Sequence, residues 1–231
     1  MTLTDDEIRI LLLSLRVALS SMLLLAVPGI LLGWLLARRE FVGKSLVDAL
    51  VHLPLVLPPV VTGYLLLLLL GRRGLLGSYL ENWLGLRIAF TWKGAAIAAA
   101  VMAFPLMVRA VRLAIEMTDR QLEDAARVHG AGPLRVLCRI TLPLAAPGII
   151  AGFVLSFVRA LGEFGATITL AGNIPGESQT LPVAVYAFAQ VPDGEASVLR
   201  LASISLAVSL VALISSNWLS RRMGGQVRHA A

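Results

Sequence analysis

The chain has 231 residues, of which 58% are hydrophobic and 15% are charged, and its formal net charge is +6. This balance excludes an ordinary soluble domain and places the chain in a lipid bilayer. The positive charge does not indicate nucleic-acid binding, because the basic residues are scattered between apolar runs instead of gathered on one face. A single cysteine, Cys138, and three separated histidines have neither disulfide nor metal-ligand spacing, so no metal site is expected.

Five apolar segments are about long enough to cross a hydrocarbon core of about 30 Å as helices. In chain order they cover residues 10–37, 54–70, 94–113, 147–170 and 198–219. The first follows the acidic Asp5, Asp6 and Glu7 instead of a basic region, so it is expected to remain as a span and not to be cleaved as a signal. The expected fold is an all-α integral membrane protein in which residues 1–231 form a single domain with five transmembrane helices.

Five spans put the two termini on opposite sides of the membrane, and the distribution of Lys and Arg decides the orientation. Alternate connections on one side carry twelve basic residues: Arg38, Arg39, Lys44, Arg109, Arg112, Arg120, Arg127, Arg135, Arg139, Arg221, Arg222 and Arg228. The other side carries six: Arg9, Arg72, Arg73, Arg87, Lys93 and Arg200. The first side is expected to be cytoplasmic, which puts the N-terminus outside and the C-terminus inside, with residues 171–199 as the longest outer loop.

One short stretch resembles part of a nucleotide-binding motif. Gly43-Lys44-Ser45 looks like the end of a P-loop, but Arg38 stands where that motif needs its first glycine. No Ser/His/Asp arrangement or nucleophile elbow is present either. The chain is therefore expected to have no catalytic residues and no cofactor of its own, and the stretch is interpreted as a turn between spans.

The cytoplasmic segment of residues 116–146 is too regular for a simple tether. Thr118 and Gln121 fit a capping box, Gly130 ends the helix that follows, and Pro133 begins a second helix over residues 134–141, which Leu142-Pro143 ends. One side of the first helix carries Leu122, Ala125, Ala126 and His129, and the other carries Arg120, Glu123, Asp124 and Arg127. The pattern predicts a projecting pair of helices, and an amphipathic loop lying on the lipid surface is the alternative.

The spacing within this segment resembles the cytoplasmic signature of ATP-binding-cassette (ABC) importer permeases. Ala125-Ala126, three residues, Gly130, nine residues and Ile140-Thr141-Leu142-Pro143 match it, with Asp124 in the place of the usual Glu and Glu123 beside it. The resemblance implies a type I permease architecture in which this segment is a coupling helix that docks on a separate ATPase subunit. The coupling residues implied are Glu123, Asp124, Ala125, Ala126, Gly130, Ile140, Leu142 and Pro143.

Further stretches narrow the resemblance to molybdate permease subunits of bacterial inner membranes. They are residues 52–61 (HLPLVLPPVV), 71–74 (GRRG), 159–167 (RALGEFGAT) and 172–177 (GNIPGE). Sulfate and thiosulfate permeases carry a similar third block but tend to be longer, with an extra span. The resemblance implies alternating access by a chain paired with a second copy, with two ATPase subunits that hold ATP and Mg, and with an external oxyanion-binding protein. Sulfate, thiosulfate or tungstate import is the nearer alternative, and a secondary anion transporter or a non-transporting scaffold is the more remote one.

The fourth span carries small and polar residues at helical spacing: Gly148, Gly152, Ser156, Arg159, Glu163 and Thr167. Arg159 and Glu163 are expected to pair, because ionisable groups at membrane depth are costly alone. The pair either fixes helix packing or lines the anion pathway, for which Ser156, Arg159, Glu163 and Thr167 are the candidates. Small-residue stripes predict helix contacts at Gly29 and Gly33 and along Ala202, Ser205, Ser209, Ala212 and Ser216. Interruptions of the spans are expected at Pro28, Pro58, Pro59, Pro105 and residues 162–165.

Overall fold

The computed structural model describes residues 3–228, without the side chains of residues 216, 217 and 219–228. Every regular element in that range is helical: α1 (Asp5–Arg38), α2 (Lys44–Val56), α3 (Pro59–Leu70), α4 (Leu75–Leu84), α5 (Trp92–Glu116), α6 (Arg120–Val128), α7 (Pro133–Val136), a π-helical turn (Leu137–Thr141), α8 (Leu142–Leu161), α9 (Gly165–Ala171), α10 (Leu181–Phe188) and α11 (Glu195–Arg228). Four helical segments in the described chain are long and apolar enough to cross a membrane, or five if the bent pair α2–α3 counts as one span. The expected all-α membrane fold is confirmed.

Helix α5 forms the centre of the bundle, with α1 and α8 packed against it. Its buried face is rich in alanine, and the facing helices bring glycines to it, which lets the backbones approach closely. A Cβ at Gly33 of α1 would lie 2.7 Å from the Val111 side chain, and one at Gly152 of α8 would lie 2.5 Å from the Ala110 side chain. The small residues of the first and fourth spans therefore make the predicted helix contacts.

The second predicted span, residues 54–70, is not one helix. Helix α2 begins at Lys44 and ends at Val56, and α3 leaves it at an angle of 112°. Pro58 and Pro59 lie at this bend, where Pro59 starts the new helix, as expected for a residue without a backbone N–H. Pro28 and Pro105, by contrast, lie inside the continuous helices α1 and α5, so the prediction of breaks at those two prolines was wrong.

The fourth predicted span, residues 147–170, begins earlier than predicted, and the interruption predicted at residues 162–165 is confirmed. Its helix α8 begins at Leu142 and stops at Leu161, and α9 starts only at Gly165 after a non-helical break. Glu163 and Thr167 therefore do not continue the face of α8 that carries Ser156 and Arg159. The outer connection also differs from a plain loop, because the apolar Leu181–Phe188 forms the short helix α10 within it.

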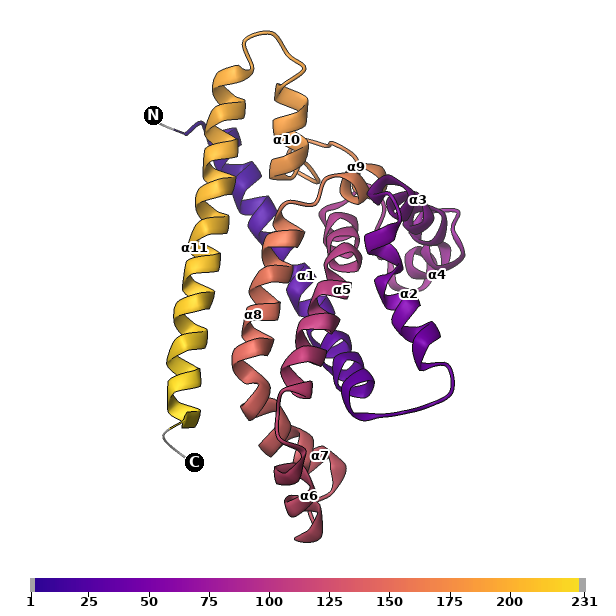
Figure 1. Cartoon of the computed structure of the whole chain (residues 1–231). Coiled ribbons are helices and arrows are strands. Elements are labelled where there is room, and N and C mark those ends of the chain that lie inside the picture. Colours follow the sequence, from indigo (N-terminus) through magenta and orange to yellow (C-terminus); the bar gives the residue numbers. More distant parts are fainter. Residues whose placement is uncertain (1–2, 229–231) are drawn as a thin grey trace.

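Figure 1 shows α6 and α7 projecting beyond the bundle at the end where α11 finishes. The beginning of α1, together with α9 and α10, lies at the opposite end. The chain therefore has one end that carries the polar helices α6 and α7 and another that carries the short helices α9 and α10.

Candidate functional site

The local sequence sets both ends of α6. Asp119 is the N-cap, and its carboxylate accepts a hydrogen bond from the backbone N–H of Gln121 at 2.9 Å. The predicted capping box at Thr118 was wrong by one residue, since the Thr118 side chain is held by Arg38 instead. Gly130 follows the helix with φ = +81°, and the N–H of Ala131 bonds back to the carbonyl of Ala126 at 3.0 Å. This closing turn needs a left-handed residue, so the predicted helix-ending role of Gly130 is confirmed.

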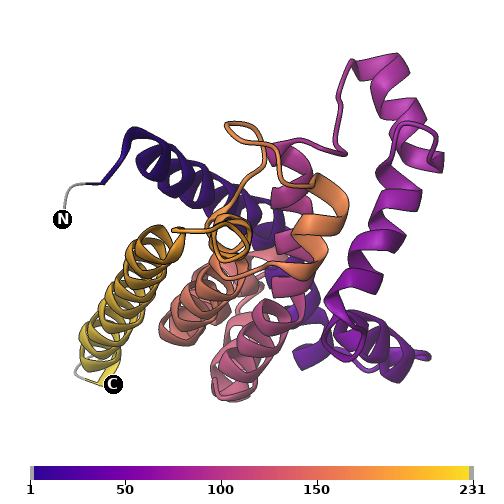
Figure 2. The same cartoon turned by 90° about the horizontal axis from the view of Figure 1, so that it is seen from above.

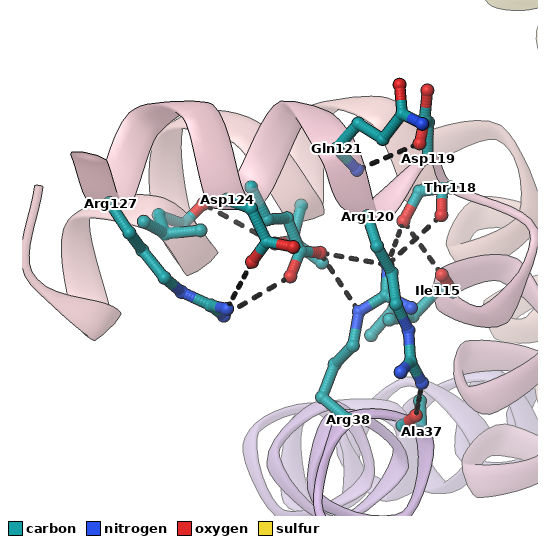
Figure 3. Close-up of polar contacts among 12 residues, drawn as sticks. Ala37, Arg38, Ile115, Thr118, Asp119, Arg120, Gln121, Asp124 and Arg127 are labelled. Carbon is teal, nitrogen blue, oxygen red and sulfur yellow. Dashed lines mark hydrogen bonds and ion pairs between the residues drawn. The ribbon is translucent and has the colours of Figure 1, made fainter. Parts of the chain in front are cut away.

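A buried ion pair joins α6 to the end of α1. Arg38 donates to the Glu123 carboxylate through Nε at 3.0 Å, and its Nη2 lies 2.9 Å from the same oxygen. The two side chains are only 5% and 4% exposed. Arg38 also donates to the carbonyl and hydroxyl oxygens of Thr118, and Figure 3 shows it reaching from α1 toward that residue.

Glu123 also binds the start of the next span. The hydroxyl of Thr141, in the π-helical turn, donates to the Glu123 carboxylate at 2.9 Å. Arg127 approaches the other carboxylate oxygen at 3.5 Å from within α6. One carboxylate thus connects α1, α6 and the turn that leads into α8. Glu123 shares its side of α6 with Arg127, as predicted, but its side chain faces inward and is buried.

The other face of α6 is open. Leu122 is 50% exposed and Val128 85% exposed, while Ala125 and His129 are exposed and Ala126 is half-buried. Asp124 is also exposed and pairs with Arg127 at 2.8 Å. Apolar and small side chains that no other part of the described chain covers form a surface suited to a protein partner.

The second half of the projecting segment, which begins at Pro133, is continuous with the span that follows. Residues Pro133–Leu161 run as one helical segment through the π-helical turn Leu137–Thr141. Pro143 does not end this segment, contrary to the prediction for Leu142-Pro143. The backbone N–H of Leu142 reaches back five residues to the carbonyl of Leu137, and this wider turn accommodates a proline that lacks a donor. Ile140, Leu142 and Pro143 therefore lie at the base of the segment, where it joins the bundle.

The second candidate site lies at the break between α8 and α9. Arg159, in the last turn of α8, pairs with the Glu163 carboxylate, which is 2% exposed, so the predicted pairing is confirmed. The other oxygen of Glu163 accepts from the backbone N–H of Ala166 at 2.9 Å, which satisfies a free donor at the start of α9. Glu163 thus connects the last turn of α8 to the first turn of α9 across the break.

Two other pathway candidates have unusual polar atoms. The hydroxyls of Ser156 and Thr167 are buried and, like those of Thr62 and Thr180, have no hydrogen-bond partner within the described chain. Buried hydroxyls are normally paired, so these four groups are exceptions within the described chain. A groove of about 700 Å³ also opens beside the break, lined by residues that include Gly162, Phe164, Tyr186, Ser205 and Ser209.

Several contacts were missed by sequence reasoning. The Arg38–Glu123 pair joins residues 85 apart, and a second buried pair, Glu7–Arg200 at 2.8 Å, joins α1 to α11. The only sequence signal for either was an ionisable residue at the edge of an apolar segment. Within residues 3–228 no group of three or more His, Cys, Asp or Glu side chains is arranged to hold a metal ion.

Several long apolar helices packed into one bundle, with a polar pair of short helices projecting from one end, have the architecture of a multi-pass membrane protein. The family profile described as "Binding-protein-dependent transport system inner membrane component" matches residues 29–225, so the chain belongs to this family of inner-membrane permeases. It is a multi-pass transport component.

The chain is similar to named permeases along nearly its whole length. It is 56% identical over 221 residues to the molybdenum transport system permease protein ModB of Escherichia coli (strain K12), covering 96% of each chain. It is 54% identical over 217 residues to the ModB protein of Haemophilus influenzae, covering 94% of this chain and 95% of that one. The sulfate transport system permease protein CysT of E. coli (strain K12) is 38% identical over 199 residues, which are 86% of this chain and 71% of CysT.

Solved structures support the fold. A chain from the inward-facing MetNI methionine ABC transporter superposes with a TM-score of 0.72 at 16% identity, covering 96% of this chain and 99% of that one. A chain of a bacterial alginate ABC transporter, solved with an alginate-bound periplasmic protein, gives 0.73 at 22% identity and covers 95% and 80%. At these identities the likeness establishes the ABC importer permease fold alone.

Proposed function

We propose that this chain is the membrane-spanning subunit of an ATP-driven importer that moves molybdate into the cytoplasm. The observation that carries the proposal is the 56% identity to a molybdenum permease over 96% of both chains. The 38% identity to CysT, which this chain covers over only 71% of its length, supports sulfate less well. Tungstate, an oxyanion of the same shape and charge, is the nearest competing cargo.

The partners follow from the same proposal. A second copy of the chain would complete the membrane core, two ATPase subunits with ATP and Mg would dock on the two coupling segments, and an external binding protein would deliver the anion. In this arrangement the end that carries α6 and α7 faces the cytoplasm and the N-terminus lies outside. The excess of basic residues on that side supports this orientation.

Within this assembly we assign Glu123 a positioning role in place of direct docking. Its carboxylate is buried against Arg38 and Thr141, whereas the open face of α6 offers Leu122, Ala125 and Ala126 to the ATPase. A movement of α6 that the ATPase causes is then transmitted to α1 through Arg38 and to α8 through Thr141. Docking and transmission are carried by opposite faces of one short helix.

The break between α8 and α9 is the proposed gate of the pathway. Ser156, Arg159, Glu163 and Thr167 lie along it, and two of them carry buried hydroxyls without a partner in the described chain. The carboxylate of Glu163 would repel an anion unless Arg159 neutralised it. The ion pair must therefore stay intact, or both residues must find other partners, when the pathway changes from outward-open to inward-open.

Co-purification tests the class of transporter directly. The chain, produced together with its ABC ATPase, is expected to elute with that ATPase in equal amounts, and a vesicle containing both is expected to take up molybdate only with ATP and the external binding protein. A secondary transporter would move the anion without the ATPase, and a scaffold would move none.

A further inference from the structure

Helix α4 has its apolar side turned away from the protein. Leu75, Tyr79 and Trp83 follow one another at helical spacing and are 77%, 67% and 83% exposed. Leu76 and Leu84, next to them around the helix, are 49% and 64% exposed. The apolar half of this ten-residue helix is therefore its outer half.

The small and polar half of α4 is the one that packs on the fold. Gly77 is buried against the end of α3, where a Cβ would lie 2.0 Å from the carbonyl oxygen of Gly71. Glu81 is held by Arg72 at 3.2 Å and by Arg87 at 3.0 Å. The hydrogen bond from Arg72 lowers the pKa of Glu81, so this clamp is charged at neutral pH. The clamp fixes the rotation of α4 and keeps its aromatic residues pointing outward.

The location of α4 indicates what covers it. The helix lies in the connection between α3 and α5, and Figure 1 shows it beside α3, at a distance from α6 and α7. Figure 2, seen along the bundle, shows α3 and α4 at the rim, on the side away from α11. Trp and Tyr are enriched in membrane proteins at the depth where the bilayer changes from hydrocarbon to headgroups.

We propose that α4 is an interfacial anchor that lies in the outer boundary of the lipid bilayer. Leu75, Tyr79 and Trp83 enter the lipid, and Arg72 and Arg87 stay at the level of the phosphates. An amphipathic helix with an aromatic apolar face and flanking arginines has the composition of such anchors. The anchor holds the outer end of the broken α2–α3 span at a fixed depth.

The test uses the fluorescence of Trp83 in the full-length chain reconstituted in phosphatidylcholine–phosphatidylglycerol vesicles. Trp34, Trp92 and Trp218 are replaced by Phe, so that only Trp83 emits. Phospholipids brominated close to the headgroup are expected to lower the emission by at least about two-fold, and aqueous iodide is expected to quench it much less than free tryptophan. The matched control moves the indole to the half-buried side of the helix with Ser78→Trp and Trp83→Ser, which turns it by about 140° away from its position in the unchanged chain. The control is expected to show weaker lipid quenching and stronger iodide quenching.

Two outcomes overturn the proposal. Strong iodide quenching of Trp83 without lipid quenching shows a helix that faces water. Protection from both quenchers shows a helix covered by a protein, such as a second copy of the chain. If the triple replacement does not fold, Trp83→Phe in the otherwise unchanged chain gives the same information, because the lipid-quenched part of the emission must then become smaller. Neither measurement depends on which anion is transported.

Discussion

The Arg38–Glu123 pair gives the most specific prediction about how the coupling segment works. Replacing Glu123 by Ala removes the carboxylate that binds both Arg38 and Thr141 and leaves a guanidinium that is 5% exposed without its counter-ion. Breaking a buried pair in this way costs about 3–5 kcal/mol. Because Arg38 keeps its bonds to Thr118, we take the lower figure, about 3 kcal/mol, which shifts the balance between attached and detached α6 by about 100-fold. The helix itself should persist, since Ala favours helix at least as well as Glu.

The neighbouring residue supplies the control. Asp124→Ala also removes one carboxylate from α6, but Asp124 has a side chain that is 67% exposed and pairs with the half-exposed Arg127. Exposed pairs contribute about 1 kcal/mol or less, so this variant is expected to behave like the unchanged chain.

Two measurements separate the variants. Trypsin cleavage at Arg120 and Arg127 in the membrane-embedded chain is expected to accelerate in Glu123→Ala and not in Asp124→Ala. In vesicles that contain the ATPase, Glu123→Ala is expected to keep most ATP hydrolysis but to import far fewer anions for each ATP hydrolysed. Equal cleavage rates and equal transport ratios for the two variants would refute the transmission role of Glu123. Loss of the ATPase from Glu123→Ala alone, with unchanged cleavage, would instead make Glu123 a docking residue.

Three further predictions concern the docking face, the ion pair at the break and the packing of the core. Ala126→Asp is expected to leave the chain inserted in the membrane but to abolish its stable binding to the ATPase on co-purification. The reason is that an unpaired charge would be desolvated in the docking surface, at a cost of several kcal/mol. Retention of the ATPase would instead favour a loop that lies on the membrane surface. Arg159→Glu is expected to abolish anion uptake, because it places two carboxylates together. The double variant in which Arg159 and Glu163 exchange places tests the role of the pair. If it restores assembly and uptake, the pair is purely structural; if it restores assembly without uptake, the polarity of the pair serves the pathway. Gly33→Ala is expected to lower thermal stability in detergent by about 1–3 kcal/mol, since the new Cβ would lie 2.7 Å from the Val111 side chain; an unchanged melting temperature would contradict the close α1–α5 contact.

Much of the fold could be predicted from residue patterns along the chain. Long apolar runs predicted α1, α5 and α11, and the glycines at the end of α6 and along α1 predicted the turn and the packing that the structure shows. Arg159 and Glu163 lie four residues apart in a membrane segment, so their pairing was also local enough to predict.

The remaining features depend on contacts between distant segments. Pro58 and Pro59 signalled an interruption but not the 112° turn, which is set by the packing of α3 against α9. The polar residues keep helical spacing through the segment around Gly162, although the backbone is not helical there. Their periodicity therefore wrongly predicted that Glu163 and Thr167 continue the face of α8. The inward orientation of Glu123 could not be predicted, because its partner Arg38 lies on another helix.

The test that bears most directly on the central claim is ATP-driven uptake of radiolabelled molybdate by vesicles that contain the chain, its ATPase and the external binding protein. We expect uptake that requires ATP, that excess unlabelled molybdate or tungstate suppresses, and that excess sulfate leaves nearly unchanged. Uptake without ATP, or uptake that sulfate suppresses as strongly as molybdate does, would contradict the assignment of this chain as the permease of a molybdate importer.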